Sequence, residues 1–100
     1  MEQVLNLIGG ELRPAIGGGW LDDHEPATGK VYAAIADSDA RDVQAAVEAA
    51  EAAGVDWRAL GREGRSKAML RLADLIERDL ELFAQAESRD SGKPVRLARV

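Results

Sequence analysis

Glu25-Pro26-Ala27-Thr28-Gly29-Lys30 separates two apolar, β-prone runs, and the fold prediction starts from this stretch. Proline fixes its own φ, and the glycine three positions later can take the positive φ that many tight turns require. The run that follows, Lys30–Ala36, alternates in part between apolar and polar residues, as strands do. The run before the turn begins at Trp20-Leu21. The sequence therefore predicts a strand, a tight turn and a second strand.

A shorter hairpin is expected upstream. Val4–Ile8 is β-prone, Gly9-Gly10 is a favoured two-residue connection, and Glu11–Ile16 is the expected return strand. Pro14 has no amide donor, which favours an edge strand or the end of one. Gly17-Gly18-Gly19 is expected to be a flexible loop, because it lacks the G-x-G-x-x-G spacing of a phosphate-binding loop and does not open a helix. Residues 1–36 are therefore predicted to be β-rich.

The rest of the chain, residues 38–100, is predicted to be helical. Ser38 is the expected N-cap of the first helix, and acidic residues favour its first turn. Gly54 is the expected end of this helix, with Trp57 in the connection that follows. A narrow apolar stripe at helical spacing contains Val43, Ala46, Val47, Ala50 and Ala53.

A second helix is expected from Arg62 to about Asp79, where a break would leave Leu80–Arg89 as a third helix. Gly92 suits a helix C-terminus, and Pro94 suits the first turn of the next helix. Because domains rarely end in a helix that has just begun, we expect the domain to be incomplete. The apolar residues of this region recur at intervals of three and four, which is typical of a core-facing stripe: Met69, Leu72, Ala73, Ile76, Leu80 and Phe83.

The composition bounds the class of protein. Apolar residues make up 46% of the chain, but much of this is alanine and aromatics are only 4%, so the core available to a free-standing domain is thin. A net charge of −5 argues against nucleic acid as a partner. No apolar run approaches the roughly 18 residues of a membrane span. Cysteine is absent, which favours a cytoplasmic protein without disulfides and excludes thiol chemistry within these residues.

Few residues invite a chemical role. Asp22-Asp23-His24-Glu25 is an acidic cluster, but it lacks the alternate spacing of a calcium-binding loop, and a solvated turn is the simpler interpretation. His24 is the single histidine, and its position gives no argument for a nucleophile with a base and an orienting group. The sequence therefore assigns no catalytic and no cofactor-binding residue.

Taken together and in order, these segments resemble the opening part of the NAD(P)-dependent aldehyde dehydrogenase family. The likeness covers almost the whole chain, with Glu25 in place of the family's usual Asn and Gly9 in place of its hairpin Asn. The matching segments are Ile8–Leu12 (family I-N-G-E-W), Glu25–Val31 (N-P-A-T-G-E-V), Asp42–Ala53 (D-V-x-x-A-V-x-A-A), Trp57, Arg71–Ile76 (R-x-A-D-L-I) and Glu87–Pro94 (E-x-x-D-x-G-K-P).

The resemblance implies an α/β fold, in which residues 1–100 form the β-hairpin, strand and helix portion at the N-terminus of a Rossmann-like cofactor-binding domain. It implies an oxidoreductase that converts a small-molecule aldehyde to a carboxylic acid with NAD or NADP. A downstream cysteine would form a thiohemiacetal and then a thioester, which a downstream glutamate would help to hydrolyse. A homodimer or homotetramer is expected. Glu87–Val100 is similar to branches that oxidise muconic semialdehydes, although betaine-aldehyde and other semialdehyde branches share most of this text.

The resemblance also implies one site in this segment. Asp90, through its carboxylate, and Asp23 and His24, through their main-chain carbonyls, match the positions that hold a monovalent cation, Na⁺ or K⁺, in family members; such hard cations prefer oxygen ligands. Alternatively, Asp90 satisfies backbone donors around the Gly92 turn. For the chain as a whole, the alternative is a small, non-catalytic, acidic helical protein that binds a partner through its alanine-rich face.

Overall fold

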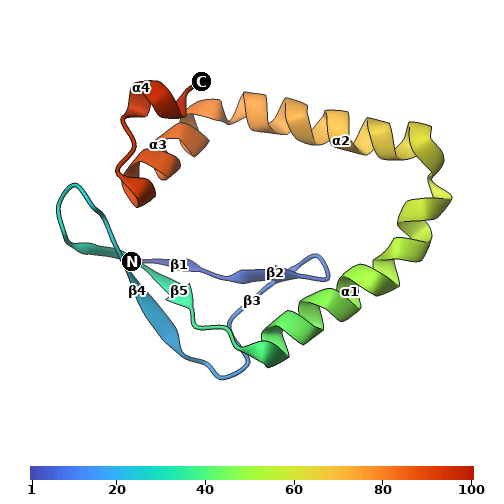
Figure 1. Ribbon diagram of the computed structural model, residues 1–100, viewed down its shortest axis with the longest axis horizontal. Coiled ribbons are helices and arrows are strands. Elements are labelled where there is room, and N and C mark those ends of the chain that lie inside the picture. Colours follow the sequence, from blue (N-terminus) through green and yellow to red (C-terminus); the bar gives the residue numbers. More distant parts are fainter. The chain divides into compact units, whose positions relative to one another are not determined.

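The computed structural model describes residues 1–100 and contains five strands and four helices (Figure 1). All strands precede all helices, and the predicted α/β segment is confirmed. The elements are β1 Glu2–Val4, β2 Asn6–Ile8, β3 Glu11–Arg13, β4 Trp20–His24, β5 Val31–Ala36, α1 Ala40–Ala59, α2 Gly61–Arg78, α3 Leu80–Ser91 and α4 Val95–Ala98.

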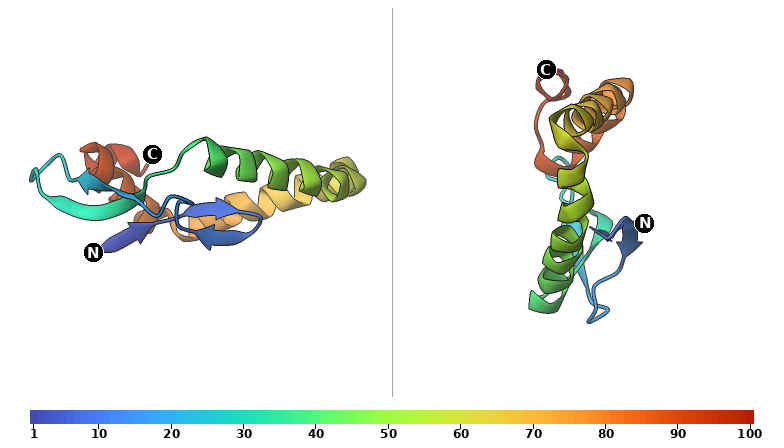
Figure 2. Two further views of the ribbon diagram at one scale, coloured as in Figure 1. Left: turned by 90° about the horizontal axis from the view of Figure 1, so that it is seen from below. Right: turned by 90° about the vertical axis from the view of Figure 1, so that its right-hand side faces the viewer.

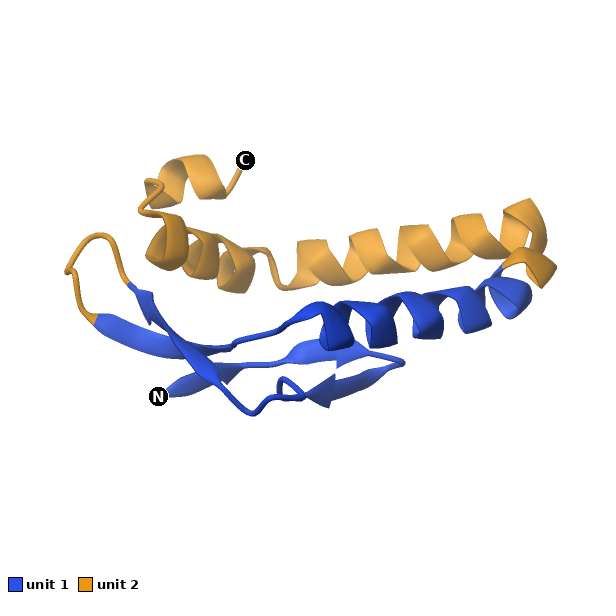
Figure 3. Ribbon diagram, turned by 60° about the horizontal axis from the view of Figure 1, so that its bottom comes forward, with its two compact units in different colours: residues 1–24, 31–57 blue, residues 25–30, 58–100 orange.

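The chain divides into two compact units (Figure 3). The strand unit comprises residues 1–24 and 31–57, and therefore includes most of α1. The helical unit comprises residues 25–30 and 58–100, so the turn between β4 and β5 belongs to it.

Within the strand unit, β5 is the central strand of a three-stranded sheet in the order β1-β5-β4. β4 runs antiparallel to β5, and β1 runs parallel to it. β2 and β3 form a separate antiparallel hairpin (Figure 2). Its turn residues Gly9 and Gly10 have φ values of 61° and 79°, as a two-residue hairpin turn with both central residues at positive φ requires. The predicted Gly-Gly hairpin and the predicted pair of strands around the Glu25–Lys30 turn are both confirmed.

Two strand predictions are wrong in their extent. Val4–Ile8 is not one strand, because Val4 ends β1, which pairs with β5, whereas Asn6 begins β2, which pairs with β3. The return strand ends at Arg13 rather than Ile16. Pro14 follows directly, and proline cannot donate the next hydrogen bond of the ladder.

The first helix differs from its prediction at both ends. Asp39, not Ser38, caps α1: its Oδ1 accepts a 2.9 Å hydrogen bond from the amide of Arg41. Gly54 does not end the helix, which continues to Ala59 and thus contains Trp57. A glycine costs a helix only about 1 kcal/mol relative to alanine, so α1 continues past Gly54. The break between α1 and α2 falls next to Gly61, which has a φ of 71°.

The later helices follow their predictions closely. The predicted break falls at Asp79, between α2 and α3. Gly92 has a φ of 78° and donates from its amide to the carbonyl of Ser88, so it ends α3 in the left-handed conformation typical of helix C-termini. Pro94 stands as the N-cap of α4, one position before the first turn.

The core of the chain is small. Ile8, Ala15, Ala33, Ala36 and Ala84 are the buried apolar residues, and four of these five are alanines. By contrast, both predicted apolar stripes remain largely exposed, as Val43 (61% exposed) on α1 and Ile76 (44%) on α2 illustrate. At the end of α1, Trp57 and Leu60 are 41% and 54% exposed. These 100 residues therefore do not cover their own apolar helix faces.

None of the four helices combines the length and the apolar character that a bilayer crossing requires. The expected cytoplasmic location stays a prediction.

Candidate functional site

The acidic cluster predicted around His24 lies at the end of β4, the edge strand of the three-stranded sheet. Asp22 stands opposite Ala34 and Asp23 opposite Ala33, and the register shifts between Asp23 and His24. Successive side chains of a strand point to opposite faces, so Asp22 and Asp23 do not converge. No group of three or more His, Cys, Asp or Glu side chains could hold a metal ion. The solvated turn therefore stays the simpler interpretation of this cluster.

Asp90 lies in the last turn of α3, directly before the Gly92 turn. Around it, Ser91 donates from its hydroxyl to the carbonyl of Glu87 at 2.7 Å, and Arg89 lies next to Glu25, with 3.6 Å between Nε and Oε1. The predicted monovalent site would combine the Asp90 carboxylate with two main-chain carbonyls of β4. It stays a prediction.

The buried carboxylate of the chain is that of Asp42, in the first turn of α1. It is only 4% exposed. Its Oδ1 accepts from the amide of Ile16 at 2.9 Å, and its Oδ2 accepts from the amide of Asp39 at 2.9 Å. With the bond from Arg41 to Asp39, this completes a reciprocal capping box, in which Asp42 takes the place of the usual Glu. Asp42 thus fastens the loop after β3 to the start of α1.

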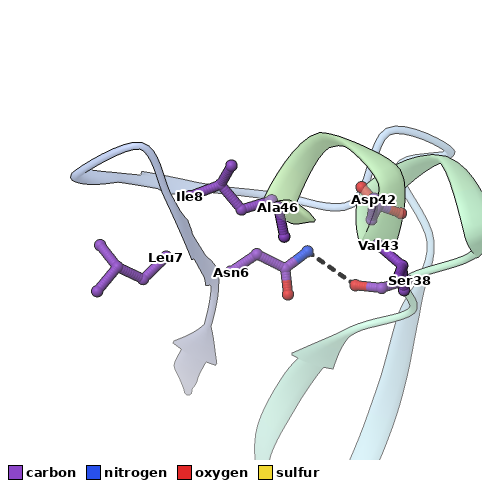
Figure 4. A pocket seen from close by; sticks show the side chains of 7 residues that line it. All are labelled: Asn6, Leu7, Ile8, Ser38, Asp42, Val43 and Ala46. Carbon is purple, nitrogen blue, oxygen red and sulfur yellow. Dashed lines mark hydrogen bonds between the residues drawn. The ribbon is translucent and has the colours of Figure 1, made fainter. Parts of the chain in front are cut away.

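A shallow pocket of about 190 Å³ opens between β2 and the start of α1 (Figure 4). Its walls are largely apolar, and its polar rim is tied by a 2.7 Å hydrogen bond from Nδ2 of Asn6 to the hydroxyl of Ser38. The lining residues are Asn6, Leu7, Ile8, Ser38, Asp42, Val43 and Ala46. Ser38, the predicted N-cap, therefore bonds across to β2 instead. This volume is below the range usual for ligand sites.

Two ion pairs shift the pKa values of surface carboxyls. Hydrogen bonds from Arg41 hold the pKa of Asp39 below its ordinary value, which keeps the cap of α1 charged. Hydrogen bonds from Arg99 and then Gln85 lower the pKa of Glu81 to about 2. Arg99 reaches Glu81 with both Nε (2.8 Å) and Nη2 (2.7 Å), a bidentate arrangement that joins α4 to α3.

The Gly17-Gly18-Gly19 loop is a turn and not a phosphate cradle, as the sequence predicts. Gly18 has a φ of 75° and donates to the carbonyl of Ala15 at 2.9 Å, and the loop leads into β4 rather than a helix. The polar groups of the segment are therefore arranged to fasten loops and helix ends. Sequence reasoning missed the role of Asp42 as an anchor. The D-x-x-D spacing of Asp39 and Asp42, a variant of the capping box, is the signal that could have revealed it.

Comparison with known proteins gives a consistent result along the chain. The sequence profile described as "Aldehyde dehydrogenase family" matches residues 17–100. The 2-aminomuconic semialdehyde dehydrogenase of Bos taurus is 46% identical over 94 residues, which are 94% of this chain and 19% of that protein. An aldehyde dehydrogenase of Paracoccus denitrificans is 42% identical over 95 residues, which are 95% of this chain and 19% of that protein. The chain thus spans about a fifth of the length of these curated relatives.

Solved structures show the same likeness. PnpE, crystallised in complex with nicotinamide adenine dinucleotide, is 40% identical with a TM-score of 0.92, and the match covers 99% of this chain and 20% of that one. The 3,6-anhydro-L-galactose dehydrogenase, solved in complex with NADP, is 26% identical with a TM-score of 0.93, and covers 98% of this chain and 20% of its own. The segment is therefore similar to one fifth of each of these enzymes.

Proposed function

Because this chain belongs to the aldehyde dehydrogenase family, we propose that it is the N-terminal structural segment of an enzyme that oxidises an aldehyde to a carboxylic acid. In the overall reaction, aldehyde, water and NAD⁺ or NADP⁺ give the acid, NADH or NADPH, and a proton. The observation that carries the proposal is the continuous match with the family over residues 17–100.

The chemistry is assigned to parts of the enzyme outside these 100 residues. The segment contains no cysteine, so the thiol that attacks the aldehyde must be supplied elsewhere, and so must the residues that bind the cofactor. Asp42 cannot serve as a base in this arrangement, because both of its oxygens already accept backbone amides. This segment would contribute shape and packing surface rather than reacting groups.

The exposed stripes of α1 and α2 support this division of roles. Large apolar residues such as Val47 (47% exposed) and Met69 (58% exposed) lie on the faces predicted to meet a core. Contiguous exposed apolar surface marks an interaction site, and alanine-rich faces allow close approach of a neighbour. We assign these faces to contacts with the remainder of the cofactor-binding domain, in an enzyme that assembles as a homodimer or homotetramer.

The proposed substrate class is a semialdehyde, an aldehyde that also carries a carboxylate. Its support is the identity of 40–48% with four relatives named 2-aminomuconic semialdehyde dehydrogenase. A relative named acetaldehyde dehydrogenase 2 is 42% identical, so the test must compare the two classes directly. A higher kcat/KM for a semialdehyde than for acetaldehyde supports this assignment, and the reverse order contradicts it.

The first experiment is the intact mass of the natural protein, followed by an assay of its activity. We expect a mass several times the 10.7 kDa of this segment and aldehyde-dependent reduction of NAD⁺ or NADP⁺, followed by absorbance in the near ultraviolet. A stable natural protein of 10.7 kDa without this activity would overturn the proposal and favour a small acidic interaction protein.

The predicted cation at Asp90, Asp23 and His24 is tested in the same assay: Asp90→Asn should abolish any dependence of the rate on K⁺ or Na⁺.

A further inference from the structure

The turn between β4 and β5 is built as a rigid loop of the helical unit. The carbonyl of Glu25 accepts from the amides of Gly29 at 2.7 Å and Thr28 at 3.2 Å, and the amide of Glu25 donates to the carbonyl of Lys30 at 2.9 Å. The hydroxyl of Thr28 accepts from the amide of Lys30. Because these bonds close the loop on itself, a contact at one of its residues acts on the whole turn.

Two contacts join this turn to the end of α3. The carboxylate of Glu25, three-quarters buried, lies 3.6 Å from Nε of Arg89. A Cβ added to Gly92 would lie 3.3 Å from Cβ of Pro26, so the backbone of Gly92 is in close contact with the proline ring. One contact is electrostatic and the other is steric. Both join two adjacent residues of the turn to the last residues of α3 and the glycine that follows them.

We propose that Glu25, Pro26, Arg89 and Gly92 form a clasp that couples the two turns, so that loosening one turn loosens the other. Its ion pair, between Glu25 and Arg89, joins residues much further apart in sequence than the other ion pairs of the helical unit do. It holds the backbone on both sides of Asp90, since Arg89 precedes and Gly92 follows that residue. It goes beyond the proposed function and does not require that a cation binds at Asp90.

The test is hydrogen exchange of the intact protein, read by mass spectrometry in the peptides that contain residues 25–30 and 86–93. Glu25→Gln removes the ion pair with little change of shape, and the glutamine oxygen can still accept the 3.3 Å hydrogen bond from the Thr28 hydroxyl. We expect exchange to become about 2- to 5-fold faster in both peptides, the size of effect that one exposed or partly exposed ion pair produces. Because coupling between two sites is reciprocal, Arg89→Gln should accelerate exchange in the 25–30 peptide as well.

A matched control is Glu63→Gln. Glu63 pairs with Lys67 at 3.4 Å within α2 and joins no second segment, so its loss should leave both peptides unchanged. Arg89 also makes an interaction besides this ion pair, and the Glu25 carboxylate also accepts from the Thr28 hydroxyl at 3.3 Å. The pair itself is therefore isolated by a double-mutant cycle of Glu25→Gln and Arg89→Gln, in which the double variant should exchange less fast than the sum of the two single effects predicts. Faster exchange of the 25–30 peptide alone after Glu25→Gln, or additive effects in the double variant, would overturn the clasp.

Discussion

The strand unit and the helical unit are stabilised in different ways. In the strand unit, contacts join residues far apart in sequence: β1 pairs with β5, and Asp42 binds the amide of Ile16. Five of the six buried residues of the chain lie in this unit, and only Ala84 lies in the helical unit. In the helical unit, α2 has no buried residue and no side-chain cap at its start. The difference indicates that the strand unit has a small core of its own, whereas α2 of the helical unit buries none of its side chains.

The largest effect expected is from a pair of identical substitutions, one in each unit. Ile8 is 7% exposed and Ile76 is 44% exposed. Ile8→Ala should lower the free energy of unfolding by about 2–4 kcal/mol, because it removes a buried side chain and leaves a cavity. Ile76→Ala should lower it by less than about 1 kcal/mol in residues 1–100 alone, since much of its surface is already in water. Urea unfolding measures both.

The same two substitutions sharpen the comparison when they are measured in the proposed full-length enzyme. If the remainder of the enzyme covers α2, the loss from Ile76→Ala should rise to the level of Ile8→Ala. If Ile76→Ala lowers the free energy of unfolding by the same small amount in residues 1–100 and in the full-length enzyme, the apolar stripe of α2 has no partner.

The second effect concerns the anchor of the strand unit. Asp42→Ala should cost about 2–3 kcal/mol, because it leaves two part-buried amides, those of Ile16 and Asp39, without an acceptor. Asp56→Ala is the control, since Asp56 is an exposed residue of the same helix and its loss should change stability by under about 0.5 kcal/mol. Similar values for the two variants would contradict the anchoring role of Asp42.

The third effect compares two glycines of the helical unit. Gly61 and Gly92 have similar positive φ values, 71° and 78°, but only Gly92 has a neighbour within reach of an added Cβ. Gly61→Ala should cost about 1 kcal/mol for the left-handed conformation alone. Gly92→Ala should cost about 2 kcal/mol, because Pro26 must also move. Thermal unfolding measures both. Equal decreases of Tm would mean that Pro26 moves away from an alanine at position 92 without cost.

The smallest effect is a local response to acid in α3 and α4. The folded pKa of Glu81 is lowered from 4.5 to about 2 by Arg99 and Gln85. The Glu81–Arg99 pair therefore contributes fully above about pH 4.5, and its contribution is lost as the pH falls toward 2. An NMR titration of the Glu81 carboxyl should show a midpoint well below 4.5, which Arg99→Gln should raise and Arg96→Gln should not. An unchanged midpoint in Arg99→Gln would exclude Arg99 as the cause.

Features specified by neighbouring residues were predictable from the sequence. The Gly9-Gly10 turn, the break at Asp79 and the left-handed Gly92 each follow from conformational preferences within a few residues. The family resemblance, carried by ordered short segments, was confirmed in the same way, whereas the cation ligands Asp23, His24 and Asp90 stay a prediction.

Features that depend on distant partners were not predictable. That Val4 and Asn6 belong to different sheets depends on β5, some thirty residues later. Ser38 does not cap α1 but accepts a hydrogen bond from Asn6 of β2, a contact that no pattern near residue 38 indicates. The predicted end of α1 at Gly54 is wrong for a local reason: glycine weakens a helix, but the cost of a single glycine is too small to end the helix.

The sheet order β1-β5-β4 sets an order of events during synthesis of the chain. β4 and β5 are joined by a short turn and can pair as soon as residue 36 is available, whereas β1, made first, pairs in parallel with β5, made last. Closing the longer loop costs more entropy, so the nascent β1 should dock onto a hairpin that has already formed. Until then the edge of β5 that receives β1 is open.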